Sequence, residues 1–319
     1  MSLLNQVQKG RKLKPLAIML HAPHGIGKST FATEAPNPIY IGNEENDELD
    51  VARFPKVKTW DDLETQLKTL LEEDHDYKTV VIDTVDGLEQ IATHFILSRP
   101  KEKATSLEAA CGGYGKGPSM MANMFLKIRD NYLIPLRDQK GLNVVLLCHS
   151  KKVKHEEAMT LTTYDHYETA IHKKVQGIFE DWVSAILFAN YYLVRAETAS
   201  GKEYAEGLDG LRMIYTEERP SHVAKNRFNF PYEIEFERTG TWNVIKGLVI
   251  NHFKKEVAQK AEQKEEFNQE AFELKKQISE LLPKMPEEVV TGVKTRVKRA
   301  GDDIEELKKV LTKAQNIVK

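Results

Sequence analysis

The fold of this chain follows from the stretch Leu16-Ala-Ile-Met-Leu-His-Ala22-Pro-His-Gly25-Ile-Gly27-Lys28-Ser29-Thr30. Its first part is an apolar run that predicts a buried strand, and a helical segment is expected after its last part. The last part fits the phosphate-loop pattern G-x-x-x-x-G-K-[ST], except that Ala22 stands at the first glycine. This strand-loop-helix context argues against the alternative, a chance Gly-Lys-Ser turn.

A loop of this kind binds the phosphates of a nucleotide. Its backbone N–H groups and the helix amino terminus surround the phosphates, the lysine reaches the β and γ oxygens, and the serine holds Mg²⁺. The residues expected to contact ATP are Pro23, His24, Gly25, Ile26, Gly27, Lys28, Ser29 and Thr30. The sequence therefore predicts a site for ATP and Mg²⁺.

Two acidic residues at the ends of other predicted strands complete this site. Asp83 ends an apolar run, where a carboxylate is suited to hold Mg²⁺ together with Ser29. Its alternative role is to cap the helix that follows. Glu44, preferred over Glu45, is expected to activate the attacking water, unless both belong to a solvated acidic surface at 44–50.

The pattern from Lys14 to about Ile250 predicts an α/β fold, because short apolar runs alternate with amphipathic stretches. Buried strands are expected at 16–20, 39–41, 79–82 and 143–148, and covering helices at 60–73 and 120–139. The continuous apolar runs favour a mostly parallel sheet that is covered on both faces. Antiparallel strands that extend this sheet are expected at 185–195, 211–216, 232–236 and 241–244.

The chain is expected to divide into a core at 1–250 and a helical extension at 251–319. The extension is rich in Lys and Glu, and the breaks at Pro283, Pro286 and Gly301 indicate about three helices. Apolar residues recur at helical spacing, which is typical of a packed bundle. The alternative is a docking element for self-association or for a replication partner.

Composition limits the classes of protein that this chain can belong to. Its 319 residues include 46 Lys and Arg against 48 Asp and Glu, for a formal charge of −2. Such a balance excludes a broadly basic nucleic-acid binder. Two cysteines and ten scattered histidines give neither a disulfide framework nor a zinc pattern. No signal peptide and no apolar run near the ~20 residues of a membrane span are recognised, so a cytoplasmic location without a membrane partner is expected.

In this order, Ala22–Ser29, Glu44 and Asp83 resemble the RecA-like P-loop ATPases, most closely the phage ATP-binding single-strand annealing recombinases of the Sak type with a RecA core. The resemblance spans about residues 16–232. It implies that His149, at the end of its strand, senses the γ-phosphate. It also implies that Lys225 and Arg227 reach the nucleotide of a neighbouring subunit, and therefore that the chain forms a homo-oligomer. The alternative for this pair is ordinary surface charge.

Two irregular stretches occupy the places where RecA-like proteins carry DNA-binding loops. The candidate DNA-contacting residues are Lys101, Lys103, Tyr114 and Lys116 in 99–119, and Lys151, Lys152 and Lys154 in 150–167. Cations that meet phosphates and a ring that stacks on a base are a combination that holds single strands. The alternative is a pair of surface connections without a ligand. Because the cations are few, DNA binding is expected to weaken steeply with added salt.

The patterns predict an ATPase, and the resemblance implies that it is DNA-dependent and acts in phage-type homologous recombination by binding, annealing or pairing single-stranded DNA. Its expected catalytic residues are Glu44, Lys28, His149, Lys225 and Arg227. A single-strand-binding protein or another replication partner is expected to bind it as well. Two alternatives stay open: an annealing protein for which ATP is only a conformational ligand, and a RecA-core accessory or motor ATPase that does not anneal DNA.

Overall fold

The computed structural model describes residues 7, 13–45, 47–100, 102–157, 162–197 and 203–318. The chain forms two compact units, Met1–Val249 and Ile250–Lys319. The strands are β1 (Ala17–Ala22), β2 (Pro38–Gly42), β3 (Ala52–Arg53), β4 (Thr79–Asp83), β5 (Asn143–Glu157), β6 (Thr162–Thr169), β7 (Ala185–Glu197), β8 (Glu203–Tyr215), β9 (Lys225–Asn226) and β10 (Glu233–Glu235). The helices of the first unit are α1 (Lys28–Thr33), α2 (Trp60–Glu72), α3 (Val85–Leu97), the short η2 (Ala110–Gly112), α4 (Lys116–Ile128), the π-turn η3 (Arg129–Leu133), α5 (Ile134–Asp138) and α6 (Lys173–Trp182).

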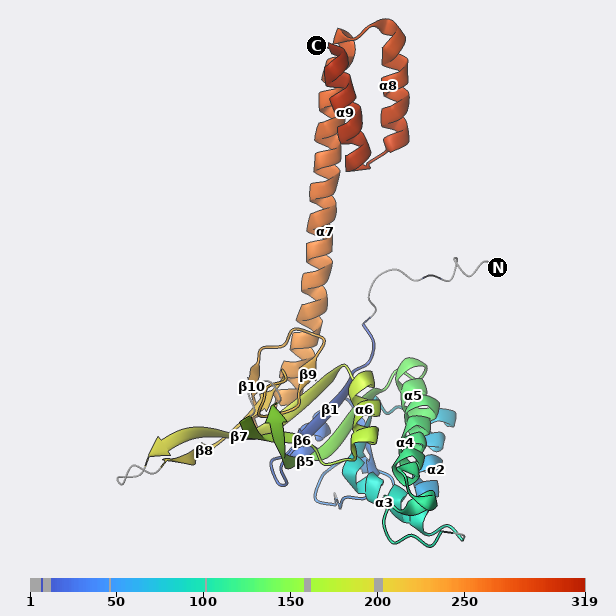
Figure 1. Ribbon diagram of the computed structural model, residues 1–319, viewed down its shortest axis with the longest axis vertical. Coiled ribbons are helices and arrows are strands. Elements are labelled where there is room, and N and C mark those ends of the chain that lie inside the picture. Colours follow the sequence, from blue (N-terminus) through green and yellow to red (C-terminus); the bar gives the residue numbers. More distant parts are fainter. Residues whose placement is uncertain are drawn as a thin grey trace. The chain divides into compact units, whose positions relative to one another are not determined.

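Among the described residues the strands form one ten-stranded sheet in the order β10-β8-β7-β1-β5-β4-β2-β3, with β6 on β5 and β9 on β7. Figure 1 labels the part of this sheet around β1, β5 and β7. The inner strands β7, β1, β5, β4 and β2 are parallel, and the pairs that β8, β9, β10 and β6 make are antiparallel. The predicted α/β class, with a mostly parallel sheet, antiparallel additions and a helical C-terminal region, is confirmed.

Both faces of the central strands are buried, as the continuous apolar runs predicted. Ala17 and Met19 of β1 join the core that is shared with helices α2 to α6. Their neighbours Ile18 and Leu20 point to the other face and are also fully buried. Helix α2 begins at the N-cap Thr59 with a reciprocal pair of hydrogen bonds to Asp62, which explains its start.

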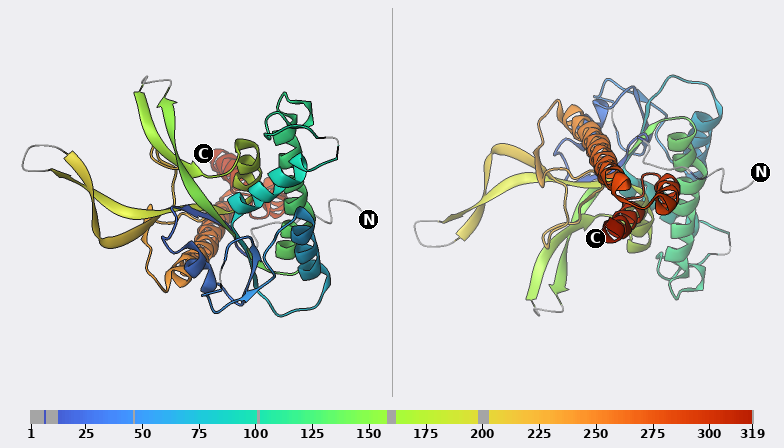
Figure 2. Two further views of the ribbon diagram at one scale, coloured as in Figure 1. Left: turned by 90° about the horizontal axis from the view of Figure 1, so that it is seen from below. Right: turned by 90° about the horizontal axis from the view of Figure 1, so that it is seen from above.

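The stretch 150–167 was expected to be irregular, and this expectation is wrong for its described residues, 150–157 and 162–167. They belong to the β5–β6 hairpin, with continuous antiparallel pairing from Ser150↔Thr169 to Glu157↔Thr162. Its lysines occupy strand positions with partners across the hairpin, as in the ion pair of Lys152 with Asp165 at 2.6 Å. The β5–β6 and β7–β8 hairpins both project from the body of the sheet (Figure 2).

Two further boundaries differ from the expectations. Thr241–Val244 is not a strand but the first turn of α7 (Thr241–Leu281). The carboxylate of Glu34 accepts hydrogen bonds from the backbone N–H groups of Gly240 and Trp242, which supplies acceptors where the helix begins. The helix expected at 120–139 begins earlier, at Lys116, and is divided by the π-turn.

The second unit contains the later part of α7, η4 (Leu282–Lys284), α8 (Glu287–Ala300) and α9 (Ile304–Val318). Its core gathers apolar residues from these helices, among them Ile278, Val293, Leu307 and Ala314. In the described part of the chain, no helix is long and apolar enough to cross a membrane.

Candidate functional site

The candidate site lies at one edge of the sheet because the inner strands are parallel. Register pairs Ala22 at the end of β1 with His149 in β5, and Gly42 at the end of β2 with Asp83 at the end of β4. The carboxyl ends of β1, β4 and β2 thus bring the phosphate loop and the acidic residues to one place, which is where open α/β sheets bind ligands.

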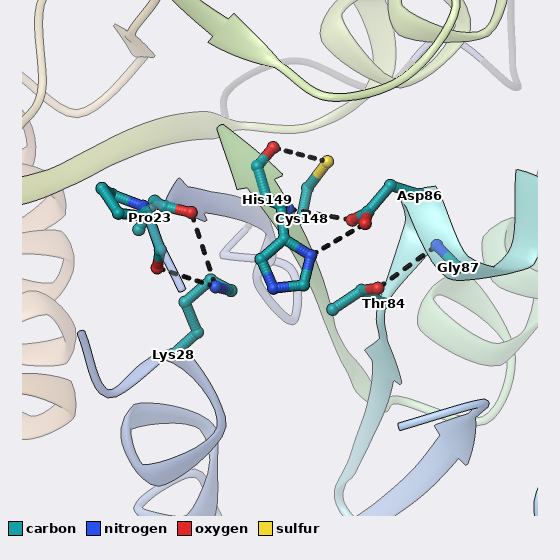
Figure 3. A network of polar contacts seen from close by, with 8 residues as sticks. Pro23, Lys28, Thr84, Asp86, Gly87, Cys148 and His149 are labelled. Carbon is teal, nitrogen blue, oxygen red and sulfur yellow. Dashed lines mark hydrogen bonds and ion pairs between the residues drawn. The ribbon is translucent and has the colours of Figure 1, made fainter. Parts of the chain in front are cut away.

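The phosphate loop has the backbone that its glycines allow. Gly25 and Gly27 adopt φ angles of 73° and 110°, and Cα of Gly25 faces open space. Lys28 is buried, with 6% of its surface exposed, and its ammonium donates to the carbonyl oxygens of Ala22 and Pro23 at 3.4 and 3.0 Å (Figure 3). Burial lowers the pKa of Lys28, against the opposing effect of Asp83. A buried cation beside a loop in which Gly25 and Gly27 lack Cβ atoms fits an anionic phosphate.

Two oxygen groups that suit a metal ion, the Ser29 hydroxyl and the Asp83 carboxylate, lie next to Lys28. The Ser29 hydroxyl donates to Oδ2 of Asp83 at 2.7 Å, and the Tyr40 hydroxyl fixes the Ser29 carbonyl by donating to it at 2.8 Å. Among the described residues there is no group of three or more His, Cys, Asp or Glu that could hold a metal. A serine and one carboxylate fit Mg²⁺, because that ion is usually bound by few side chains together with phosphate oxygens and water.

His149 is held beside the loop by Asp86 in the first turn of α3. The carboxylate of Asp86 accepts from the His149 backbone N–H at 2.9 Å and lies 2.8 Å from Nδ1 of its ring (Figure 3). The same ring stacks on His24, with centroids 3.6 Å apart. Burial alone would raise the pKa of Asp86, but the hydrogen bonds from His149 outweigh it and keep that pKa below its usual value.

Glu44 stands at the carboxyl edge, just after β2. Its backbone N–H donates to the Asp83 carbonyl at 3.3 Å, and both residues line a hollow of about 490 Å³. Glu45 is engaged by Lys56 at 3.2 Å, whereas within residues 13–45 and 47–100 no ion pair involves Glu44. The carboxylate of Glu44 also contributes to the field at Lys28, where it opposes the lowering of the lysine pKa. The structure therefore brings Glu44 and Lys28 within electrostatic reach of each other.

The phosphate loop, Lys28, Ser29 and Asp83 can together bind a nucleoside triphosphate. A comparison with known families agrees with this interpretation. The family described as AAA domain matches residues 14–228, which is more than half of the chain. The chain belongs to the AAA domain family. It therefore carries a P-loop nucleotide-binding domain of the ATPase type, a class that binds nucleotide and usually Mg²⁺. No curated protein is a significant match.

Lys225 and Arg227 do not lie at the phosphate loop of their own AAA domain. β9 pairs with Ala185 and Ile186 of β7, and these are in register with Ile18 and Met19, early in β1. The Lys225 ammonium donates to the Glu180 carbonyl, and Arg227 donates to the Asp181 carbonyl at 2.9 Å. Both cations thus meet the last carbonyl groups of α6, an interaction that favours a helix carboxyl end.

The first group of DNA-contacting candidates is exposed in part. Tyr114 is 99% exposed, and Lys103 is exposed as well. Tyr114 has a positive φ of 52° between two glycines with φ near 75°, a conformation in which its ring points away from the core. Lys116 is exposed and begins α4, so the expected irregular stretch ends before it and is interrupted by η2. Lys101 lies outside the described residues.

The second group lies on the β5–β6 hairpin, where two of the three lysines are already engaged. Lys151 donates to the Ile171 carbonyl at 2.9 Å and lies 3.3 Å from Glu168, and Lys152 pairs with Asp165 at 2.6 Å. Lys154 is exposed. The hairpin also carries three neighbouring rings, His155, Tyr164 and His166, which the sequence did not single out.

Two further residues of the site were missed from the sequence. Asp86 had a signal, since it is an acid three positions after Asp83 at a helix start. Arg212 had none, since it is one of several charged residues in the mixed sequence of β8. Its guanidinium donates to the Ile26 carbonyl and lies 4.9 Å from the centre of the Phe236 ring. A Cβ on Gly27 would lie 2.9 Å from this guanidinium, so the glycine leaves room for it.

Proposed function

We propose that this AAA domain protein is a Mg²⁺-dependent ATPase that acts on single-stranded DNA in phage-type homologous recombination, by annealing or pairing strands. The observation that carries the ATPase part is the meeting of Lys28, the Ser29–Asp83 pair, Glu44 and His149 at one sheet edge. Each of these residues supplies one function that phosphoryl transfer requires.

The roles follow from charge and position. Lys28 neutralises charge on the β and γ oxygens, and the loop N–H groups orient the phosphates. Ser29 and Asp83 would hold Mg²⁺, which supplies further charge neutralisation at the phosphates when bound. Glu44 accepts a proton from the attacking water, because of the two neighbouring acids Glu44 and Glu45 it is Glu45 that pairs with Lys56. His149 reports the γ-phosphate to the β5–β6 hairpin, since it lies on β5 where the strand leaves the central sheet.

Arg227 and Lys225 are proposed to complete the site of a neighbouring subunit. A cation supplied in trans can offset charge on the transferred phosphoryl group and couple turnover to assembly. The support is that β9 pairs at a level of the sheet that corresponds to the beginning of β1, whereas the phosphate loop of the same subunit follows the end of β1. Contact with DNA is proposed for Lys103, Tyr114 and Lys116, a combination of cations and one exposed ring.

A second candidate function is an accessory ATPase that does not anneal DNA. One observation favours it: Lys151 and Lys152 are already paired with Glu168 and Asp165, which leaves the hairpin fewer cations for phosphate groups. An annealing protein for which ATP is only a conformational ligand is the third candidate.

One set of assays separates these functions. ATP turnover is measured with and without oligo-dT, and annealing of complementary oligonucleotides is measured with and without ATP. Turnover that DNA stimulates, and that Lys28→Ala abolishes while the surface control Lys140→Ala does not, supports the proposal. Annealing that survives Lys28→Ala supports the conformational-ligand candidate. Absence of DNA binding at low salt eliminates both the annealing ATPase and the conformational-ligand candidate, and leaves the accessory ATPase.

A further inference from the structure

A groove between α8 and α9 of the second unit has an apolar floor. The two helices lie side by side and run antiparallel, so the start of α8 faces the end of α9 (Figure 1). A hollow of about 510 Å³ between them is lined by Val289, Val293, Val310 and Ile317. Val293 and Val310 also belong to the core of this unit, and Ile317 is 38% exposed. The floor of the groove is therefore an accessible extension of the core.

The rim of the groove is basic. A second hollow of about 460 Å³ shares Arg296, Val310 and Lys313 with the first one and adds Arg299 and Lys309. Lys309 is paired with Glu306 at 2.7 Å. Within the described residues 265–318, no ion pair involves Arg296, Arg299 or Lys313. Arg296 and Lys313 thus border the apolar floor without acidic partners, and the acid Glu288 lies at one end of it. Arg299 lies in the adjoining hollow, which the paired Lys309 and Glu306 also line.

We propose that this groove binds an acidic amphipathic helix of a partner protein. Apolar side chains at helical spacing would enter the floor over Val293 and Val310. Carboxylates along the same helix would meet Arg296 and Lys313 beside the floor, and Arg299 in the adjoining hollow. A helix in a groove is a common mode of peptide recognition, and charge complementarity at the rim gives it specificity.

The chemistry of the groove favours a peptide over a nucleic acid. None of the residues that line it is aromatic, so bases would find no ring on which to stack. Phosphate groups would use the cations but would leave the apolar floor uncovered. A ligand that combines carboxylates with apolar side chains satisfies both parts of the groove.

The test measures binding of fluorescein-labelled peptides to the full chain by anisotropy. The probe is a peptide of about 18 residues with Leu at helical spacing on one face and Glu elsewhere, and its counterpart carries Lys in place of Glu. We expect the acidic peptide to bind saturably and the basic one not to bind. The double variant Arg296→Glu/Lys313→Glu should weaken binding at least about tenfold. Ile317→Glu, which places an acid on the floor, should weaken it as well.

The control is Lys294→Glu/Lys298→Glu, which makes the same total charge change. Both of its substitutions lie on a face of α8 that lines a different hollow. This control should change binding less than about twofold, with thermal unfolding of all variants similar to that of the parent chain. Equal binding of both peptides, or equal loss in both double variants, would overturn the proposal. Binding of oligo-dT, but not of the acidic peptide, that depends on Arg296 and Lys313 would assign the groove to nucleic acid instead. The readout needs no ATP turnover, so it stands apart from the proposed ATPase.

Discussion

At the scale of single residues, the site depends on groups that act through a neighbour. Asp86 fixes both the backbone and the ring of His149 with one carboxylate. Because an ionised carboxylate only accepts hydrogen bonds, Nδ1 of His149 must carry a proton there, which leaves Nε2 as the atom that can face a ligand. Asp86 is thus a positioning residue for the proposed γ-phosphate sensor.

Asp86→Asn tests this role. The amide can still accept from the His149 backbone, but its NH₂ group opposes the Nδ1–H of the ring, so the ring loses its orientation. We expect kcat for ATP to fall about 10- to 100-fold, with KM changed less than about threefold. Asp61→Asn removes an exposed aspartate from the first turn of α2 and should leave kcat unchanged. A rise in KM for ATP without a loss of kcat would contradict the role of Asp86.

His21 is a second residue whose environment sets a measurable property. It is fully buried in β1, its Nε2 lies 2.8 Å from the Val223 carbonyl, and its Nδ1 lies 2.9 Å from the Ser150 hydroxyl. Burial lowers the pKa of His21 to about 4, from an ordinary value of 6.5. The unfolded chain therefore binds one more proton than the folded chain between these values, so stability from His21 is present above pH 6.5 and is lost as pH falls toward 4.

The matching prediction compares wild type with His21→Gln, whose amide can keep the hydrogen bond to the Val223 carbonyl. When the pH falls from 7.5 to 5, the unfolding free energy of wild type should decrease by about 2 kcal/mol more than that of the variant, because only wild type contains His21. Urea unfolding at both pH values measures the difference. Parallel losses in the two proteins would contradict the assignment.

At the scale of elements, close contact between β2 and α3 positions Glu44. A Cβ on Gly87 of α3 would lie 1.9 Å from Oδ1 of Asn43, the residue that precedes Glu44. A Cβ on Gly42 would lie 1.8 Å from the Asp83 carbonyl. The end of β2 therefore approaches β4 and α3 as closely as it does only because both positions lack a side chain.

A matched pair of glycine substitutions tests this packing. Gly87→Ala should displace Asn43, cost about 1–3 kcal/mol of stability and lower ATP turnover, because Glu44 moves with it. Gly177→Ala in α6 meets open space and should stabilise the protein by about 0.5–1 kcal/mol without changing turnover. Thermal unfolding and ATPase rates measure both effects. Equal behaviour of the two variants would mean that the contact at Gly87 does not position Glu44.

At the scale of the whole molecule, the separation of Arg227 from its own phosphate loop predicts complementation between subunits. Arg227→Ala should bind ATP nearly normally and lose turnover, and Lys28→Ala should lose turnover because its own loop is defective. Mixed in equal amounts, the two inactive proteins should regain about a quarter of the wild-type rate, since intact loops then meet intact arginines in about a quarter of the interfaces.

The same experiment distinguishes a purely structural role for Arg227. Its guanidinium binds the Asp181 carbonyl at the end of α6, so its removal could also destabilise that helix. In that case Arg227→Ala would lower the melting temperature, but the variant would still hydrolyse ATP at temperatures where it is folded. It would also show no complementation with Lys28→Ala. Either result assigns the residue.

Comparison of prediction with structure shows where local sequence was sufficient. The strands of the parallel sheet and the loop around Lys28 were predicted, because continuous apolar runs and the Gly-x-Gly-Lys-Ser pattern carry their own physical reason. The strand predicted at 241–244 was wrong, because a helix starts there and its first N–H groups are bound by the carboxylate of Glu34, more than two hundred positions away. The hairpin at 150–167 was missed because its lysines resemble a solvated loop until their partners across the strands are known.

The sequence by itself determined a P-loop α/β domain of the ATPase type with a helical extension, because burial of apolar runs and the conformation of glycine act locally. Only the tertiary structure decided which charged groups meet: Asp86 with His149, Arg212 with the phosphate loop, and Arg227 with α6. These contacts join elements that are distant along the chain, and their register is fixed by strand order and helix packing. No local pattern encodes that order.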